Sequence, residues 1–194
     1  MKKLIGPKKV ETAVFISGTG SNLKCLVYSS LSKHSYIKIN FVVSDNSKAK
    51  GLGFATKHRI KTKVYKFDKR NNPEKKILLD LKKKKIKLIC LAGFMKILSK
   101  NFIKSFDGII LNIHPSLLPK YKGLNTHKRA IENNDKFSGC TVHYVTPKLD
   151  SGKIILQKKV KIFKKDNPKS LAIRILKQEH ILYPKAIKIA VINS

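Results

Sequence analysis

The sequence predicts an α/β protein with a mostly parallel sheet and helices on both faces. Short apolar or β-branched runs recur up to residue 114, and segments of helical length lie between them. A strand, a helix and a second strand in succession form a βαβ unit, so this alternation favours a parallel, Rossmann-like sheet.

Each predicted element in the first part of the chain follows from its composition. The apolar runs expected to form buried strands are TAVFIS at 12–17, INFVVS at 39–44, KVYKF at 63–67, KLICLAG at 87–93 and GIILNIH at 108–114. The segments between them have the length of ordinary helices, and we expect helices at 21–33, 47–59 and 73–85.

The second part of the chain departs from this alternation. A helix is expected at 126–133, followed by two strands, GCTVHYVT at 139–146 and KIILQKKVKI at 153–162. A final helix should run from Pro168 to about Ala190, with Asn167 as its cap, because proline is tolerated in the first turn. No repeat or linker divides the sequence, so we expect one domain spanning residues 1–194.

The net charge of +32 raises the question of a nucleic-acid partner. The basic residues are spread along the chain, and only Arg59, Arg70, Arg129 and Arg174 are arginines. Proteins that recognise the bases and phosphates of nucleic acids are usually rich in arginine and present aromatic side chains on which bases stack. A solvated lysine surface is therefore favoured, with no specific nucleic-acid partner. Attraction of anionic small substrates and incidental RNA binding stay open.

Other features of composition point to a cytoplasmic protein. No apolar run approaches the roughly 20 residues that span a bilayer, and the first residues do not resemble a secretion signal. The three cysteines, Cys25, Cys90 and Cys140, form no CxxC pair, so neither a zinc site nor a disulfide framework is predicted.

A glycine-containing turn follows the first predicted strand. Its residues are Gly18, Thr19, Gly20, Ser21 and Asn22. Glycines let the backbone approach a ligand, and a helix start offers free N–H groups to an anion, so this turn is a candidate phosphate site. A purely structural turn is the alternative, since the stretch is neither a P-loop nor a full dinucleotide fingerprint.

Asn112 and His114 stand two residues apart at the end of the fifth predicted strand. Alternate residues of a strand share a face, and Pro115 should end the strand directly after them. An amide and a protonated imidazole suit a carbonyl group that becomes an oxyanion. Taken alone, His114 could equally be a loop histidine bonded to backbone, and Ser116 is expected to shape the turn.

Asp150 lies in a turn between the two late strands, where aspartate usually caps its own backbone. If it instead approaches His114, its negative charge would favour the imidazolium. His34, His58, His127 and His180 show no metal-ligand spacing, so surface or packing roles are favoured and no metal is predicted. His143 is less certain, because its strand leads to Asp150.

Five motifs in register give the chain a family resemblance. ISGTGSNL, LAGFMKILS, NIHPSLLPKYKG, VHYVTPKLDSG and KQEHILYP resemble the phosphoribosylglycinamide formyltransferases of purine biosynthesis. The resemblance runs from about Thr12 to about Ala190, and residues 1–11 look like a short N-terminal extension. It implies the formyltransferase fold, and we expect a monomer or weak homodimer.

The resemblance also implies the reaction and its residues. The formyl group of 10-formyltetrahydrofolate, a co-substrate, would pass to the amino group of phosphoribosylglycinamide, with Asn112, His114 and Asp150 as the catalytic residues. The substrate phosphate would lie on Gly18, Thr19, Gly20, Ser21 and Asn22, and Glu179 would contact the glycinamide or ribose part. The folate side would comprise Arg70, Met95, Lys96, Ile97, Leu98 and Asn112.

Three residues depart from the family pattern. Lys96 stands where arginine is usual, Lys122 where proline is common, and Asn125 where histidine is usual. An ammonium group lacks the planar, two-pronged recognition of a guanidinium, so we expect the folate contact at Lys96 to be weaker or to be made through backbone groups, and Asn125 to alter a secondary polar contact. Three alternative functions stay open: a formyltetrahydrofolate hydrolase, a methionyl-tRNA formyltransferase and a basic nucleic-acid-binding module without catalysis. The first would be expected to carry an added regulatory domain and the second a carboxy-terminal tRNA-binding domain, and from the sequence we expect neither.

Overall fold

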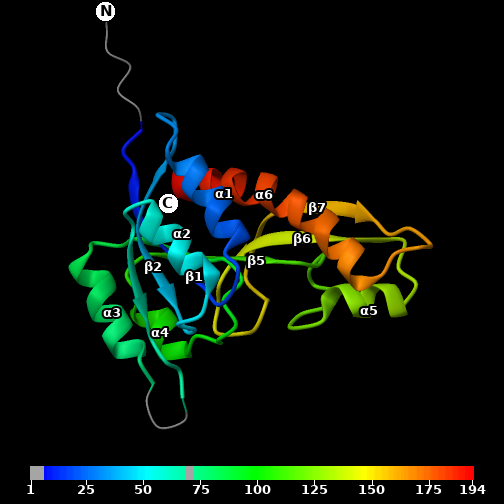
Figure 1. Cartoon of the computed structure of the whole chain (residues 1–194), viewed down its shortest axis with the longest axis horizontal. Helices are drawn as coiled ribbons and strands as arrows, with labels where there is room; N and C mark the ends of the chain where they lie inside the picture. Colours follow the sequence, from blue (N-terminus) through cyan, green and yellow to red (C-terminus); the bar gives the residue numbers. More distant parts are fainter. Residues whose placement is uncertain (1–6, 69–71) are drawn as a thin grey trace, which may run out of the picture.

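Seven strands form one sheet in the computed structural model of the chain, which describes residues 7–68 and 72–194 (Figure 1). The strands are β1 Val10–Ile16, β2 Ile37–Ser44, β3 Lys61–Val64, β4 Leu88–Leu91, β5 Ile109–His114, β6 Phe137–Tyr144 and β7 Ile154–Lys161. Across the sheet their order is β3-β2-β1-β4-β5-β6-β7. The first five pair in parallel and the last two add antiparallel, so the predicted mostly parallel sheet is confirmed.

Helices cover both faces of this sheet, as the sequence predicted (Figure 1). They are α1 Ser21–Ser30, α2 Lys50–Lys57, α3 Glu74–Lys83, α4 Lys100–Ser105, α5 Thr126–Glu132 and α6 Pro168–Ile192. Val14 and Ile16 belong to the core that α1, α2 and α6 cover, whereas Ala13 and Phe15 belong to the core under α3 and α4. Successive residues of β1 thus face opposite layers.

Some boundaries differ from the sequence prediction. β3 covers Lys61–Val64 rather than 63–67, because its partner β2 ends at Ser44 and the chain leaves the sheet there. The short helix α4 was not predicted, although Ser99 caps it by accepting a hydrogen bond from the Phe102 N–H. β1 begins at Val10, so two residues of the expected extension lie in the sheet.

The long helix α6 starts where the sequence predicted. The Asn167 side chain accepts hydrogen bonds from the N–H groups of Lys169 and Ser170, at 3.0 and 2.9 Å, and Pro168 occupies the first turn. Further along, the hydroxyl of the buried Tyr183 donates to the carbonyls of Leu91 and Leu111. This contact fixes α6 over the end of β4 and the middle of β5.

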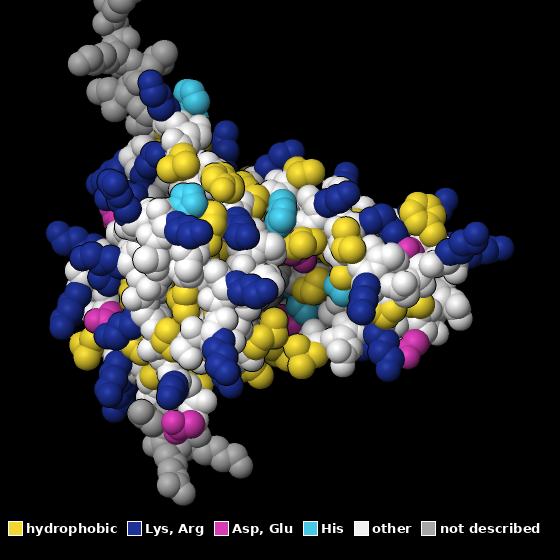
Figure 2. Space-filling view, in the orientation of Figure 1, with side chains coloured by type: hydrophobic (Ala, Val, Ile, Leu, Met, Phe, Trp, Pro, Cys, Tyr) yellow, Lys and Arg dark blue, Asp and Glu magenta, His cyan; other side chains and the backbone are white. Residues whose placement is uncertain are grey.

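On the face drawn in Figure 2, lysine and arginine side chains are dispersed rather than gathered in one patch. Both edge strands carry them: Lys61 and Lys63 on β3, and Lys158, Lys159 and Lys161 on β7. Charged side chains on an edge oppose pairing with other chains, so part of the basic charge has a structural role. Within the described residues, no helix combines the length and apolar character needed to span a bilayer.

Candidate active site

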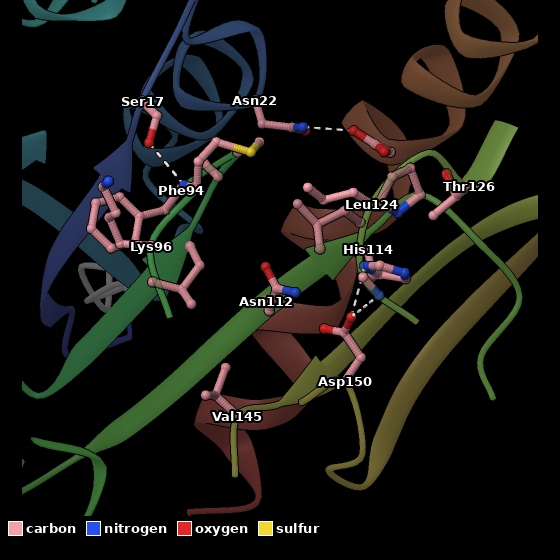
Figure 3. Close-up of a pocket in the computed structure, with 18 of the residues that line it drawn as sticks. Ser17, Asn22, Phe94, Lys96, Asn112, His114, Leu124, Thr126, Val145 and Asp150 are labelled. Carbon is pink, nitrogen blue, oxygen red and sulfur yellow. Dashed lines mark hydrogen bonds and ion pairs between the residues drawn. The ribbon is translucent and has the colours of Figure 1, made fainter. Parts of the chain in front are cut away.

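A cavity of about 790 Å³ opens at the carboxyl ends of β1, β4 and β5 (Figure 3). In a parallel sheet these ends lie at one edge, where ligands of open α/β proteins bind. The loop after β1, the loop after β4, the β5 end, the β6–β7 loop and α6 all contribute to its lining. The chain segments that the sequence singled out therefore meet around one space.

The glycine turn after β1 forms one wall of the cavity, and all five of its predicted residues line it. Gly20 has φ 73°, and a Cβ there would lie 2.8 Å from the Gly51 Cα. Only glycine fits both the left-handed backbone and this close approach. Gly20 also has no side chain to cap α1, so the first N–H groups of that helix stay available for a ligand anion.

Asn112 and His114 both line the cavity from the end of β5, as expected for residues two positions apart in a strand, which face the same side. His114 Nε2 lies 2.8 Å from the carbonyl oxygen of Tyr121. A carbonyl can only accept, so this nitrogen carries a hydrogen. Ser116 donates from its hydroxyl to the Lys120 carbonyl at 2.6 Å, which matches the expected turn-shaping role.

Asp150 approaches His114 from the β6–β7 loop. Its Oδ2 lies 3.4 Å from His114 Nδ1 and accepts a hydrogen bond from the Gly123 N–H at 2.9 Å. The side chains of Asp150 and His114 are 8% and 7% exposed, so a protonated imidazole would form a nearly desolvated ion pair with the carboxylate. Asn112, His114 and Asp150 point toward one another in Figure 3.

His143, whose role the sequence left uncertain, also belongs to this cluster. Antiparallel pairing sets it beside Asn112, whose Nδ2 lies 3.2 Å from His143 Nε2. His143 Nδ1 donates to the Tyr144 carbonyl at 2.8 Å. Burial lowers the pKa of His143, which favours a neutral ring whose Nε2 accepts from Asn112. The 3.7 Å approach to Asp150 is then a contact of a neutral imidazole.

Glu179 reaches the opposite side of the cavity from α6. Its Oε2 accepts a hydrogen bond from Asn22 Nδ2 at 2.7 Å, so residues 157 positions apart in the sequence are joined. Burial raises the pKa of Glu179, and the hydrogen bond from Asn22 opposes this shift. A carboxyl group that is costly to ionise and lines a cavity is suited to a polar or cationic substrate group.

The expected folate-side residues divide into two groups. Met95, Lys96 and Ile97 lie exposed at the cavity, whereas Leu98 lines the cavity but is buried in the core under α3 and α4. The Met95 N–H donates to the Ser17 hydroxyl at 2.8 Å, which joins this loop to the end of β1 (Figure 3). Arg70 was also expected here, but it lies outside the described residues.

The residues that depart from the expected pattern lie at or near the cavity. Lys96 and Asn125 line it, and Asn125, directly before α5, has a left-handed φ of 57°. Lys122 bonds to Ser151, next to Asp150. His127 also lines the cavity, and burial lowers its pKa, whereas the sequence favoured only a surface or packing role.

The other histidines do not line this cavity: His34 and His58 are exposed, and burial lowers the pKa of His180 on α6. No group of three or more His, Cys, Asp or Glu side chains positioned to hold a metal ion occurs among residues 7–68 and 72–194. Among the polar side chains that line the cavity are the amide of Asn112, the imidazoles of His114, His127 and His143, and the carboxyl groups of Asp150 and Glu179.

The chain is similar to known formyltransferases. The sequence pattern of the family described as formyl transferase matches residues 10–187. A phosphoribosylglycinamide formyltransferase of Escherichia coli (strain K12) is 40% identical over 177 residues, which are 90% of this chain and 84% of that protein. The crystal structure of phosphoribosylglycinamide formyltransferase from Anaplasma phagocytophilum superposes with a TM-score of 0.90 at 41% identity. It covers 96% of this chain and 88% of the other.

A second group of relatives is much longer. The trifunctional purine biosynthetic protein adenosine-3 of Homo sapiens is 40% identical over 185 residues, which are 94% of this chain. The chain spans only 18% of the length of that protein. The similarity is thus confined to one part of the trifunctional relatives, whereas it covers most of the bacterial ones.

Proposed function

The chain belongs to the formyl transferase family, and we propose that it transfers the formyl group of 10-formyltetrahydrofolate to the amino group of phosphoribosylglycinamide. The observation that carries this proposal is the approach of Asp150 to His114 beside Asn112, in a cavity whose opposite wall is the glycine turn. A reacting carbonyl and a bound phosphate could then occupy the same cavity.

The proposed reaction is direct attack of the substrate amine on the formyl carbon. The amine lone pair forms the new C–N bond while the carbonyl electrons move to oxygen, and the tetrahedral oxyanion needs donors. Asn112 supplies one, since only one of its two amide hydrogens is directed at His143. Protonated His114, held by Asp150, supplies positive charge and a proton.

Collapse of the tetrahedral intermediate breaks the bond from the formyl carbon to the folate nitrogen. That nitrogen takes up a proton as it leaves, and the new amide nitrogen loses one. In this proposal Asp150 receives that proton through water: its Oδ2 faces His114, and its Oδ1 lies 3.7 Å from His143 Nε2. The net reaction gives the formylated amine and tetrahydrofolate.

In this proposal the two substrates bind to different parts of the cavity lining. The glycine turn, Gly18 to Asn22, holds the substrate phosphate, and Glu179 contacts the glycinamide or ribose part. Met95, Lys96, Ile97, Leu98 and Asn112 form the folate side, to which the family resemblance adds Arg70, outside the described residues. We further propose that residues 1–194 work as one domain, as a monomer or weak homodimer in the cytoplasm, without a specific nucleic-acid partner.

The test is formyl transfer from 10-formyltetrahydrofolate to phosphoribosylglycinamide, followed as formation of the formylated product. His114→Ala should lower the rate at least about 100-fold, the usual contribution of a positioned acid or base. His34→Ala, which changes an exposed histidine away from the cavity, is the matched control and should retain wild-type activity. Release of formate without use of the amine would favour a hydrolase instead. Folded wild-type protein that does neither would refute the proposal.

A further inference from the structure

Two loops form the cavity wall beside His114. We call residues 121–125 the Tyr121 loop and residues 146–152 the Asp150 loop. Tyr121, Gly123 and Asn125 all have positive φ, and so does Asp150, with φ 43°. Left-handed backbone is unfavourable for residues that carry a Cβ, so contacts elsewhere in the fold must hold these loops in place.

Adjacent residues of the two loops make adjacent hydrogen bonds. Lys122 Nζ donates to the Ser151 hydroxyl oxygen at 2.5 Å, and the Gly123 N–H donates to Asp150 Oδ2 at 2.9 Å. The second bond holds the carboxylate that faces His114. The first bond ties down the residue that follows Asp150 in the chain.

The direction of the bond to Ser151 follows from the chemistry of the two groups. An ammonium group can only donate, so the Ser151 oxygen must accept from Lys122. The single hydroxyl hydrogen of Ser151 is then directed at the Leu149 carbonyl, which lies 2.8 Å away. Lys122 thereby orients a hydroxyl that closes the turn from Leu149 to Ser151, and Asp150 lies at the centre of that turn.

The backbone at Lys122 is itself anchored. Arg129 Nη1, on α5, donates to the Lys122 carbonyl at 2.8 Å, and Arg129 Cζ lies 5.1 Å from the centroid of the Tyr121 ring, a cation–π contact. The lysine ammonium therefore extends from a fixed point toward the Asp150 loop. Proline, the residue that the family resemblance led us to expect at this position, has no side-chain donor and could not form this bond.

We propose that Lys122 is a positioning residue that holds the Asp150 loop against the Tyr121 loop and so keeps Asp150 on His114. This inference rests on the proposed function of the same cavity. It assigns to one lysine a role in the rate of the chemical step, without contact between that lysine and the substrate.

The first test compares the kinetics of three variants with wild type. Lys122→Met removes the ammonium but keeps much of the side-chain length. We expect kcat to fall about fivefold to tenfold, as for loss of one charge-assisted, partly exposed hydrogen bond, with KM for the amine substrate unchanged. Lys122→Arg, which retains donors, should restore most of kcat. Lys120→Met removes a neighbouring lysine that pairs outward with Asp135 and should behave as wild type.

The partner residue supplies a further check. In Ser151→Ala the acceptor of the Lys122 bond is lost, so the double variant with Lys122→Met should be no slower than the slower single variant. Losses that multiply in the double variant would mean that the two side chains act separately, which would overturn the proposal.

The second test does not depend on activity. Amide hydrogen exchange at residues 149–152 should be faster in Lys122→Met than in wild type and unchanged in Lys120→Met. Unchanged exchange, a kcat within about twofold of wild type, or a loss confined to KM would each overturn the proposal. If wild-type protein transfers no formyl group, the proposed function fails, and the exchange measurement still decides whether Lys122 holds the Asp150 loop.

Discussion

The buried hydroxyl of Tyr183 provides a sharp test of how α6 is fixed to the sheet. Tyr183→Phe removes one oxygen and leaves the ring, so packing changes little while the hydroxyl contacts to the carbonyls of Leu91 and Leu111 are lost. Tyr183 is 1% exposed, so water cannot replace the hydroxyl without opening the core. Loss of a hydrogen bond that leaves a buried acceptor unpaired costs about 1–3 kcal/mol.

We therefore expect the free energy of unfolding to fall by about 2 kcal/mol, measured by urea denaturation followed by circular dichroism. In a domain of this size the same change corresponds to about 4–8 °C in melting temperature. Tyr28→Phe is the matched control, because Tyr28 is 59% exposed and its hydroxyl can bond to water. A loss below about 0.5 kcal/mol for Tyr183→Phe, or an equal loss in both variants, would refute the reasoning.

Three further predictions follow from the site and the charge. In Gly152→Ala a Cβ would lie 1.8 Å from the Tyr144 carbonyl oxygen, so the Asp150 loop would have to move. We expect the free energy of unfolding to fall by about 2 kcal/mol, measured by urea denaturation, and formyl transfer to slow in the transfer assay. Burial raises the pKa of Glu179, so protonation is favoured in the folded state and stability falls as pH rises above about 4.3, the value for an unfolded glutamate. Glu179→Gln should consequently raise the melting temperature at pH 7 but not at pH 4, while activity falls; equal effects at both pH values would contradict this sign. If the charge of +32 attracts anionic substrates, kcat/KM should fall about tenfold between about 0.05 and 0.5 M salt at nearly constant kcat, and a flat kcat/KM would exclude steering.

Local signals in the sequence were sufficient for most of the architecture. Strands and helices were predictable because apolar runs and caps such as Asn167 depend on neighbouring residues. The short helix α4 escaped prediction because six residues are too few to show a helical period. The end of β3 was misplaced because the pairing stops where the partner strand β2 stops, at Ser44. The residues of β3 carry no information about where β2 ends.

The candidate site was predictable only in part. The sequence by itself determined that Asn112 and His114 share a face at a strand end, since side-chain parity is a local property. Only the tertiary structure decided that Asp150 reaches His114, that strand register brings His143 to Asn112, and that Lys122 bonds to Ser151. These contacts join segments 29 to 36 residues apart, and their geometry depends on register, left-handed turns and packing across the sheet, which no local pattern encodes.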